Sequence, residues 1–178
     1  MKMGIAGIMV VAGLAASAQA DFSGPYAPNQ WEFINNGGSG SINTAGAPSE
    51  VTLTGDDSAL ANTYTQWQIK VPFGGTFKFN WLYTSTDTGT FDVGGYLTSI
   101  DGVNFDYVQL SDNATQGSGV IELTDVKQGT YLGFYVLSVD GVFGPGNLTI
   151  SQFSGPVPAP GALALVGLAG AMSLRRRR

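Results

Sequence analysis

Carboxylic acids are the main source of acid–base and metal chemistry in this chain of 178 residues, which has thirteen of them and contains neither histidine nor cysteine. The absence of histidine excludes Ser-His and Cys-His catalytic pairs and imidazole zinc sites. The absence of cysteine excludes thiol catalysis and thiolate metal sites. No acid is marked out by its neighbours as half of a glycosidase pair. We therefore expect that the protein is not an enzyme.

One short motif invites a catalytic interpretation. The run Asp87-Thr88-Gly89-Thr90 matches the D-T-G-T signature of aspartic proteases. That chemistry needs two aspartates that share a proton, and the motif occurs only once. The preceding residues 84–86 are polar rather than apolar. Because Asp, Thr and Gly are turn formers, we expect a turn between two strands here.

Calcium binding is a second possibility for the acids. Calcium ions take oxygen ligands from carboxylates and backbone carbonyls on loops. Asp87, Asp92 and Asp140 follow or lie near strands that we expect to be neighbours. The hypothesis is one structural calcium ion held by these three residues, and the alternative is that they are solvated surface acids.

Aromatic side chains suggest a third kind of site. Sugar-binding sites often combine exposed aromatic rings with polar hydrogen-bonding groups. The candidates for glycan contact are Trp31, Trp67, Tyr96 and Tyr107. Their positions within expected strands favour the alternative that these rings fill the core.

The elements that must position these residues are strands. Residues 76–84 alternate strictly, with Phe77, Phe79, Trp81 and Tyr83 on one face. Residues 130–139 are apolar on both faces, which is typical of a central strand that is covered on both sides. The full set of expected strands is 30–34, 50–54, 63–71, 76–84, 91–100, 104–110, 120–124, 130–139 and 147–153, with a short edge strand near Ile42.

Frequent turn signals and the lack of helical periodicity between these strands predict an all-β protein. We expect a single antiparallel β-sandwich over residues 21–155, most simply a jelly roll. It is flanked by two targeting segments, an N-terminal signal helix and a C-terminal apolar helix.

The N-terminal segment, residues 1–20, has the pattern of a secretory signal peptide. Lys2 precedes an apolar run over residues 5–16, and Ala18 and Ala20 form the small-residue cleavage pattern. We expect cleavage before Asp21. Without both ends the domain retains three lysines and all thirteen acids, a net charge of −10. Such a surface repels phosphate backbones, so nucleic acid is not an expected partner.

The C-terminal segment, residues 156–178, has three parts in a fixed order. Val157-Pro158-Ala159-Pro160 is followed by an apolar run over residues 161–174. Four arginines end the chain: Arg175, Arg176, Arg177 and Arg178. The apolar run with its flanking prolines just reaches across a bilayer core, and the arginines would hold the end in the cytoplasm.

This arrangement resembles the PEP-CTERM sorting signal of bacterial proteins that are processed by exosortases. Ala159 stands where that family usually has Glu, so the tail looks like a variant subclass. The resemblance implies export in a Gram-negative bacterium, a transient stage in the inner membrane and cleavage by an exosortase-type protease. The alternative is a permanent single-span anchor.

Together these observations predict an exported, non-enzymatic protein of the cell surface or extracellular matrix, associated with exopolysaccharide or biofilm. A carbohydrate-binding module is the alternative function, and a secreted hydrolase is the third. No cofactor is expected apart from the hypothetical calcium ion.

Overall fold

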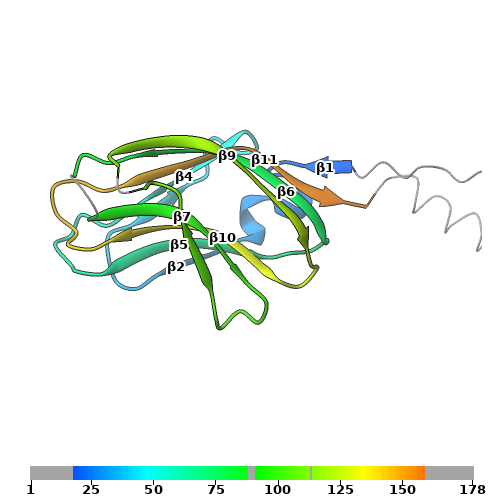
Figure 1. The fold of residues 1–178 in the computed structure, drawn as a ribbon, viewed down its shortest axis with the longest axis horizontal. Helices are drawn as coiled ribbons and strands as arrows, with labels where there is room; N and C mark the ends of the chain where they lie inside the picture. Colours follow the sequence, from blue (N-terminus) through cyan, green and yellow to red (C-terminus); the bar gives the residue numbers. More distant parts are fainter. Residues whose placement is uncertain (1–17, 88–90, 113, 159–178) are drawn as a thin grey trace, which may run out of the picture. The chain divides into compact units, whose positions relative to one another are not determined.

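A computed structural model describes residues 18–87, 91–112 and 114–158, and there every regular element except two short 3₁₀ turns is a β-strand (Figure 1). The chain divides into two units, and Gln19–Val157 is the unit described here. The predicted signal helix, the apolar sorting helix and the arginine cluster lie outside the described residues. Within the described part, no helix is long and apolar enough to cross a membrane.

Two antiparallel sheets pack face to face, which confirms the predicted all-β sandwich. The larger sheet has the spatial order β3-β4-β11-β6-β9, with β1 also paired to β11. Its strands are β1 (Ala18–Ala20), β3 (Ser41–Asn43), β4 (Glu50–Thr54), β6 (Gly75–Thr84), β9 (Gln116–Val126) and β11 (Asn147–Val157).

The smaller sheet has the order β2-β5-β10-β7-β8. Its strands are β2 (Glu32–Asn35), β5 (Thr63–Lys70), β7 (Asp92–Ser99), β8 (Asp106–Gln109) and β10 (Tyr131–Ser138). From β4 to β11 the chain changes sheet at every connection except the β7–β8 hairpin. Each sheet therefore contributes one apolar face to a shared core.

The strict alternation predicted for β6 is confirmed. Phe77, Phe79 and Tyr83 are fully buried, Trp81 is half-buried, and Lys78 on the opposite face is exposed. Buried aromatic rings remove large apolar areas from water, so this strand supplies much of the core. β10 is also buried on both faces, as its composition predicted.

An aromatic cluster closes one end of the core. Phe22 stacks on Phe153 with ring centroids 4.6 Å apart, and Tyr26 meets Phe153 edge-on at 5.5 Å. The Tyr26 hydroxyl donates a 2.7 Å hydrogen bond to the carbonyl of Pro156. The Gly- and Pro-containing residues 21–29 predict an irregular lead-in, but this segment packs into the core and forms the 3₁₀ turns η1 (Gly24–Tyr26) and η2 (Pro28–Gln30). The compact unit runs to Val157, two residues past the expected domain end.

Two local expectations were wrong. Period-two alternation over the expected strand 30–34 places Trp31 and Phe33 on one face, but Trp31 is buried and Phe33 is exposed, because Trp31 ends the η2 turn and precedes β2. The polar residues 111–118 predict a loop, but residues 116–118 begin β9. Gly117 and Gly119 of this strand lie under the Trp81 ring, where a Cβ at Gly119 would stand 2.8 Å from Trp81 Nε1.

Candidate functional site

The outer face of the five-stranded sheet, the side that points away from the core, carries tyrosines and glutamines. In β5 the core side holds Trp67 and Ile69, so the alternating residues Tyr64, Gln66 and Gln68 lie on the outer face. Residues paired on neighbouring strands extend this face across the sheet: Tyr135↔Gln66, Tyr135↔Gly95, Gly95↔Gln109 and Leu97↔Tyr107. We call it the outer face below.

A row of hydrogen-bonded side chains crosses the outer face. The Tyr107 hydroxyl donates to Gln66 Oε1 at 3.1 Å, Gln66 Nε2 donates to Gln68 Oε1 at 2.7 Å, and Gln68 Nε2 donates to Glu32 Oε2 at 3.1 Å. An ionised carboxylate can only accept, so Glu32 fixes the orientation of both amides. We call these four residues the amide row. Gln66 and Gln68 are only 3% and 5% exposed, so the groups of the row that a ligand can reach are Tyr107 and Glu32 at its two ends.

A hollow of about 360 Å³ opens beside this row. Its lining residues are Tyr64, Val93, Tyr107, Gln109, Tyr135 and Leu137. The Tyr107 and Tyr135 rings meet edge-on at 5.1 Å, and Tyr107 remains 52% exposed. Gly95 makes room for this arrangement, because a Cβ there would lie 2.7 Å from Tyr135 Cε1. The hollow therefore combines apolar walls, an exposed ring and fixed polar groups, which is the usual make-up of a small-ligand site.

Two tyrosines of the hollow, Tyr107 and Tyr135, stay neutral over the physiological range. Burial, followed by the neighbouring Tyr107, raises the pKa of Tyr135 to about 12. Burial and then Tyr64 raise the pKa of Tyr107. Both hydroxyls can therefore donate as well as accept hydrogen bonds.

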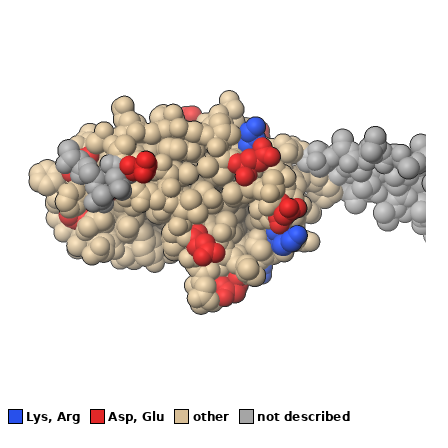
Figure 2. All heavy atoms as spheres, in the orientation of Figure 1, with Lys and Arg blue, Asp and Glu red and all other residues tan. Residues whose placement is uncertain are grey.

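Charge is sparse on the outer face. Glu32 lies at one end of the amide row, and the Lys70 ammonium stands 5.9 Å from the centre of the Tyr131 ring. Figure 2 shows isolated acidic and basic side chains on an otherwise uncharged surface. A ligand of the hollow must therefore be recognised by hydrogen bonds and ring contacts rather than by charge.

The structure corrects most of the predicted glycan contacts. Trp31 and Trp67 are only 7% and 3% exposed and stack on each other at 4.2 Å inside the core. Tyr96 points inward and meets Phe79 edge-on at 6.0 Å. Among the four candidates, Tyr107 alone lies exposed on the outer face.

The residues missed by sequence reasoning alternate with the core residues. In the expected strand 63–71 the alternation places Tyr64 on the face opposite Trp67 and Ile69, and Gln66 and Gln68 fall on the same face as Tyr64. Alternate residues of a strand share one face, and this was the available signal. Once Trp67 is known to face the core, Tyr64, Gln66 and Gln68 must lie on the outer face.

The three aspartates of the calcium hypothesis lie near one another at one end of the sandwich. Burial raises the pKa of Asp92, hydrogen bonds from Ser138 and Ser85 lower it, and the carboxylates of Asp87 and Asp140 raise it further. Asp87 and Asp140 also line one hollow with Phe91 and Phe143. Within residues 18–87, 91–112 and 114–158, no group of three or more carboxylates is arranged to hold a metal ion. The calcium ion stays a prediction.

The remaining predicted sites fall at or beyond the ends of the described chain. Asp87 follows β6, and its N–H donates to Ser85 Oγ at 3.1 Å, while residues 88–90 of the D-T-G-T motif lie outside the described part. Ala18 and Ala20 of the expected cleavage pattern lie in β1. Val157 ends β11, Pro158 follows it, and Ala159, Pro160 and the arginines are outside the described residues.

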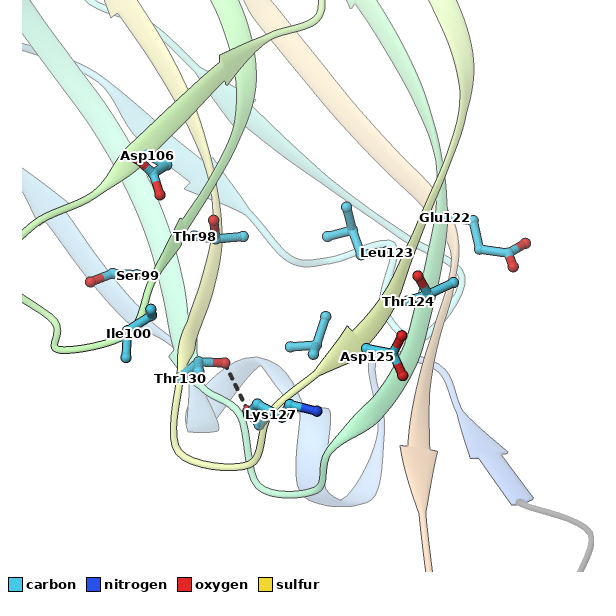
Figure 3. Close-up of a pocket in the computed structure, with 11 residues that line it drawn as sticks. Thr98, Ser99, Ile100, Asp106, Glu122, Leu123, Thr124, Asp125, Lys127 and Thr130 are labelled. Carbon is cyan, nitrogen blue, oxygen red and sulfur yellow. Dashed lines mark hydrogen bonds between the residues drawn. The ribbon is translucent and has the colours of Figure 1, made fainter.

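A second cleft opens at the edge of the sandwich between β7 and β9 and has a volume of about 500 Å³ (Figure 3). Leu123 points from β9 into the cleft, and Glu122 points away from it. The Thr130 hydroxyl donates to the carbonyl of Lys127 at 2.8 Å on the cleft wall. The cleft shows that β9 is not covered by β7 along this part of its length.

Comparison with known proteins gave matches among solved structures alone. No family model matches the chain, and no curated protein matches it. TmCBM61 in complex with beta-1,4-galactotriose is 13% identical, with a TM-score of 0.43, over 74% of this chain and 90% of that one. A carbohydrate binding module of family 29 is 9% identical, with a TM-score of 0.46, over 83% and 98%.

The matches also include the enzymatically active domain of tailspike protein 4 from bacteriophage CBA120. It is 14% identical, with a TM-score of 0.40, over 72% of this chain and 20% of that one. Likeness at these identities and TM-scores says nothing of what this chain binds.

Proposed function

We propose that this domain is a non-catalytic carbohydrate-binding module that holds a neutral glycan chain on the outer face of its five-stranded sheet. The observation that carries the proposal is the amide row beside the exposed ring of Tyr107. A sugar presents C–H groups on one side and hydroxyls around its rim. An exposed aromatic face with an oriented hydroxyl, fixed by the amide row, matches both features.

The preference for a neutral glycan follows from charge. The mature domain carries a net charge of −10, and the outer face holds a carboxylate at Glu32. A chain rich in uronate, sulfate or phosphate would be repelled by this field. The nearby cation, Lys70, already lies over the ring of Tyr131.

The fold and the delivery route belong to the same proposal. The strand orders β4-β11-β6-β9 and β5-β10-β7-β8 correspond to the eight strands of a jelly roll. The PEP-CTERM-like tail would place this module at the surface or in the matrix of a Gram-negative cell, where exopolysaccharide is the available glycan. The intact mass of the protein from cells tests the route: an end near residues 156–160 supports processing, and a mass that includes Arg178 contradicts it.

Binding is tested by affinity electrophoresis and calorimetry of residues 19–157 against neutral glucans, mannans and galactans and against acidic alginate and polygalacturonate. We expect retention by at least one neutral polymer and by neither acidic one. Tyr107→Ala should weaken binding at least ten-fold, which is about 1.4 kcal/mol, because it removes the exposed ring and one end of the amide row.

The control is Val103→Ala, which truncates an exposed apolar side chain on the loop between β7 and β8 and should leave binding unchanged. The proposal is wrong if no neutral polymer is retained, or if Tyr107→Ala and Val103→Ala bind alike.

A further inference from the structure

The strand β9 is an unusually long free edge. The other strands that end the two sheet orders are β3, β2 and β8, with 3, 4 and 4 residues, whereas β9 has 11. An edge strand presents a row of backbone N–H and C=O groups that can pair with another strand. Short length is a common protection against such pairing, and β9 lacks it.

The other common protections are also missing from most of β9. Residues 116–124 contain no proline and one charged residue, Glu122. The ladder with β6 is regular from Thr84↔Gln116 to Phe77↔Leu123. It becomes irregular only at the far end, where Asp125 adopts a left-handed backbone with φ of 57°. The regular, nearly uncharged part is therefore available for pairing.

The side chains of this part fit a second copy of themselves. On the core side, the first half of the strand has only Gly117 and Gly119, and the second half has the half-buried Ile121 and Leu123. The midpoint of residues 116–124 is Val120. A two-fold axis at Val120 places Ile121 of one copy opposite Gly119 of the other, and Leu123 opposite Gly117.

Charges and exposed apolar groups agree with the same register. Glu122 of one copy would face Ser118 of the other, so no acid faces an acid. On the outer side of this sheet Val120 is 57% exposed and Leu82, on the neighbouring strand, is 51% exposed. Across the seam the two Val120 side chains would meet directly, with Leu82 of each copy diagonal to its own Val120.

We propose that β9 pairs antiparallel with β9 of a second copy of this chain, centred on Val120, and joins the two larger sheets into one. The cleft beside Leu123 leaves this edge open to the partner (Figure 3). An in-plane antiparallel junction has its two-fold axis perpendicular to the sheets, so the outer faces of both copies point to the same side. If the proposed glycan site is correct, this dimer holds one polysaccharide at two sites and gains affinity from their linkage. The pairing itself does not depend on that function.

The chain has no cysteine, so single cysteines report the register directly. In residues 19–157, which form a compact unit of their own, Val120→Cys places two thiols directly opposite each other across the axis. Opposed residues in an antiparallel pair have Cα atoms about 4.5–5.5 Å apart, within the range of a disulfide. Ser118→Cys is the matched control on the same face, since its two copies would be offset by four residues, or about 13 Å.

Under mild oxidation we expect Val120→Cys to form a covalent dimer at least ten-fold faster than Ser118→Cys, with circular dichroism confirming that both variants are folded. Sedimentation of the unsubstituted domain should show a dimer that Val120→Lys dissociates and that Val103→Lys, on an exposed loop, leaves intact. Equal cross-linking rates, faster linking of Ser118→Cys, or a monomer at every concentration up to about 1 mM would each overturn the proposal. A monomer that still binds glycan would reject the pairing and leave the proposed function standing.

Discussion

Replacing Tyr26 by Phe tests whether the chain beyond residue 155 belongs to the folded domain. The Tyr26 hydroxyl is fully buried and donates a 2.7 Å hydrogen bond to the carbonyl of Pro156, 130 residues away in sequence. Tyr26→Phe keeps the ring and its edge-on contacts with Phe77 and Phe153. The substitution therefore removes one hydrogen bond and leaves a buried carbonyl without its partner.

The expected loss in the free energy of unfolding is about 1–3 kcal/mol, the usual cost of an unsatisfied buried polar group. For a domain of this size that corresponds to a fall in melting temperature of roughly 3–10 °C. Urea unfolding followed by the fluorescence of the buried Trp31 and Trp67 measures the change. Tyr96→Phe is the control, because the Tyr96 hydroxyl makes no hydrogen bond to any residue that the structure describes, and it should cost less than about 0.5 kcal/mol.

A double-mutant cycle isolates the partner. Tyr26→Phe should cost about 1–3 kcal/mol in residues 19–157 and close to nothing in residues 19–155, where Pro156 is absent. Equal costs in the two lengths would refute the reasoning and return the domain end to 155. If the cycle gives the expected coupling, a protease that removes the tail must cut beyond Pro156 to leave the fold intact.

Two further predictions concern pH and buried charge. The pKa of Tyr135 is raised to about 12 from an ordinary value of 10, so the unfolded state ionises at a lower pH than the folded state. The contribution of Tyr135 to the free energy of unfolding is therefore complete below pH 10 and falls by about 2–3 kcal/mol as the pH rises to 12. Tyr135→Phe should remove part of this pH dependence in alkaline unfolding curves, and a curve identical to that of the unsubstituted domain would contradict the prediction. The pKa of Asp92 is also raised, chiefly by burial, so the ionised carboxylate lowers the stability of the fold at neutral pH. Asp92→Asn should therefore raise the melting temperature at pH 7, and this gain should disappear below about pH 4. A lower melting temperature at pH 7 would show that the hydrogen bond from Ser85 outweighs the cost of burying the charge.

Period-two patterns made most of the strands predictable, because each strand has one side in the core. The aromatic row of β6 and the two-sided burial of β10 followed directly from the order of their residues. The start of β9 did not, because Gly117 and Gly119 lack side chains and carry no pattern of their own. Their strand conformation depends on Trp81, which comes from a different strand. The burial of Phe22 and Tyr26 likewise depends on Phe153 at the other end of the chain.

The candidate site was less predictable because the pattern gives the alternation of a strand and not which side meets the second sheet. In β5, Trp67 and Gln66 lie on opposite faces. The prediction that Trp67 contacts a glycan therefore assigned the site to the face that is in fact buried in the core. Packing in the folded domain settles the assignment, since Phe22 from the N-terminal segment and Trp31 at the end of η2 pack around Trp67. Gln66 and Gln68 then have to satisfy their amides on the outer face, and Glu32 and Tyr107 from the two edge strands supply the partners. The amide row exists because three strands distant in sequence, β2, β5 and β8, are brought into one sheet, so no single stretch of the chain contains it.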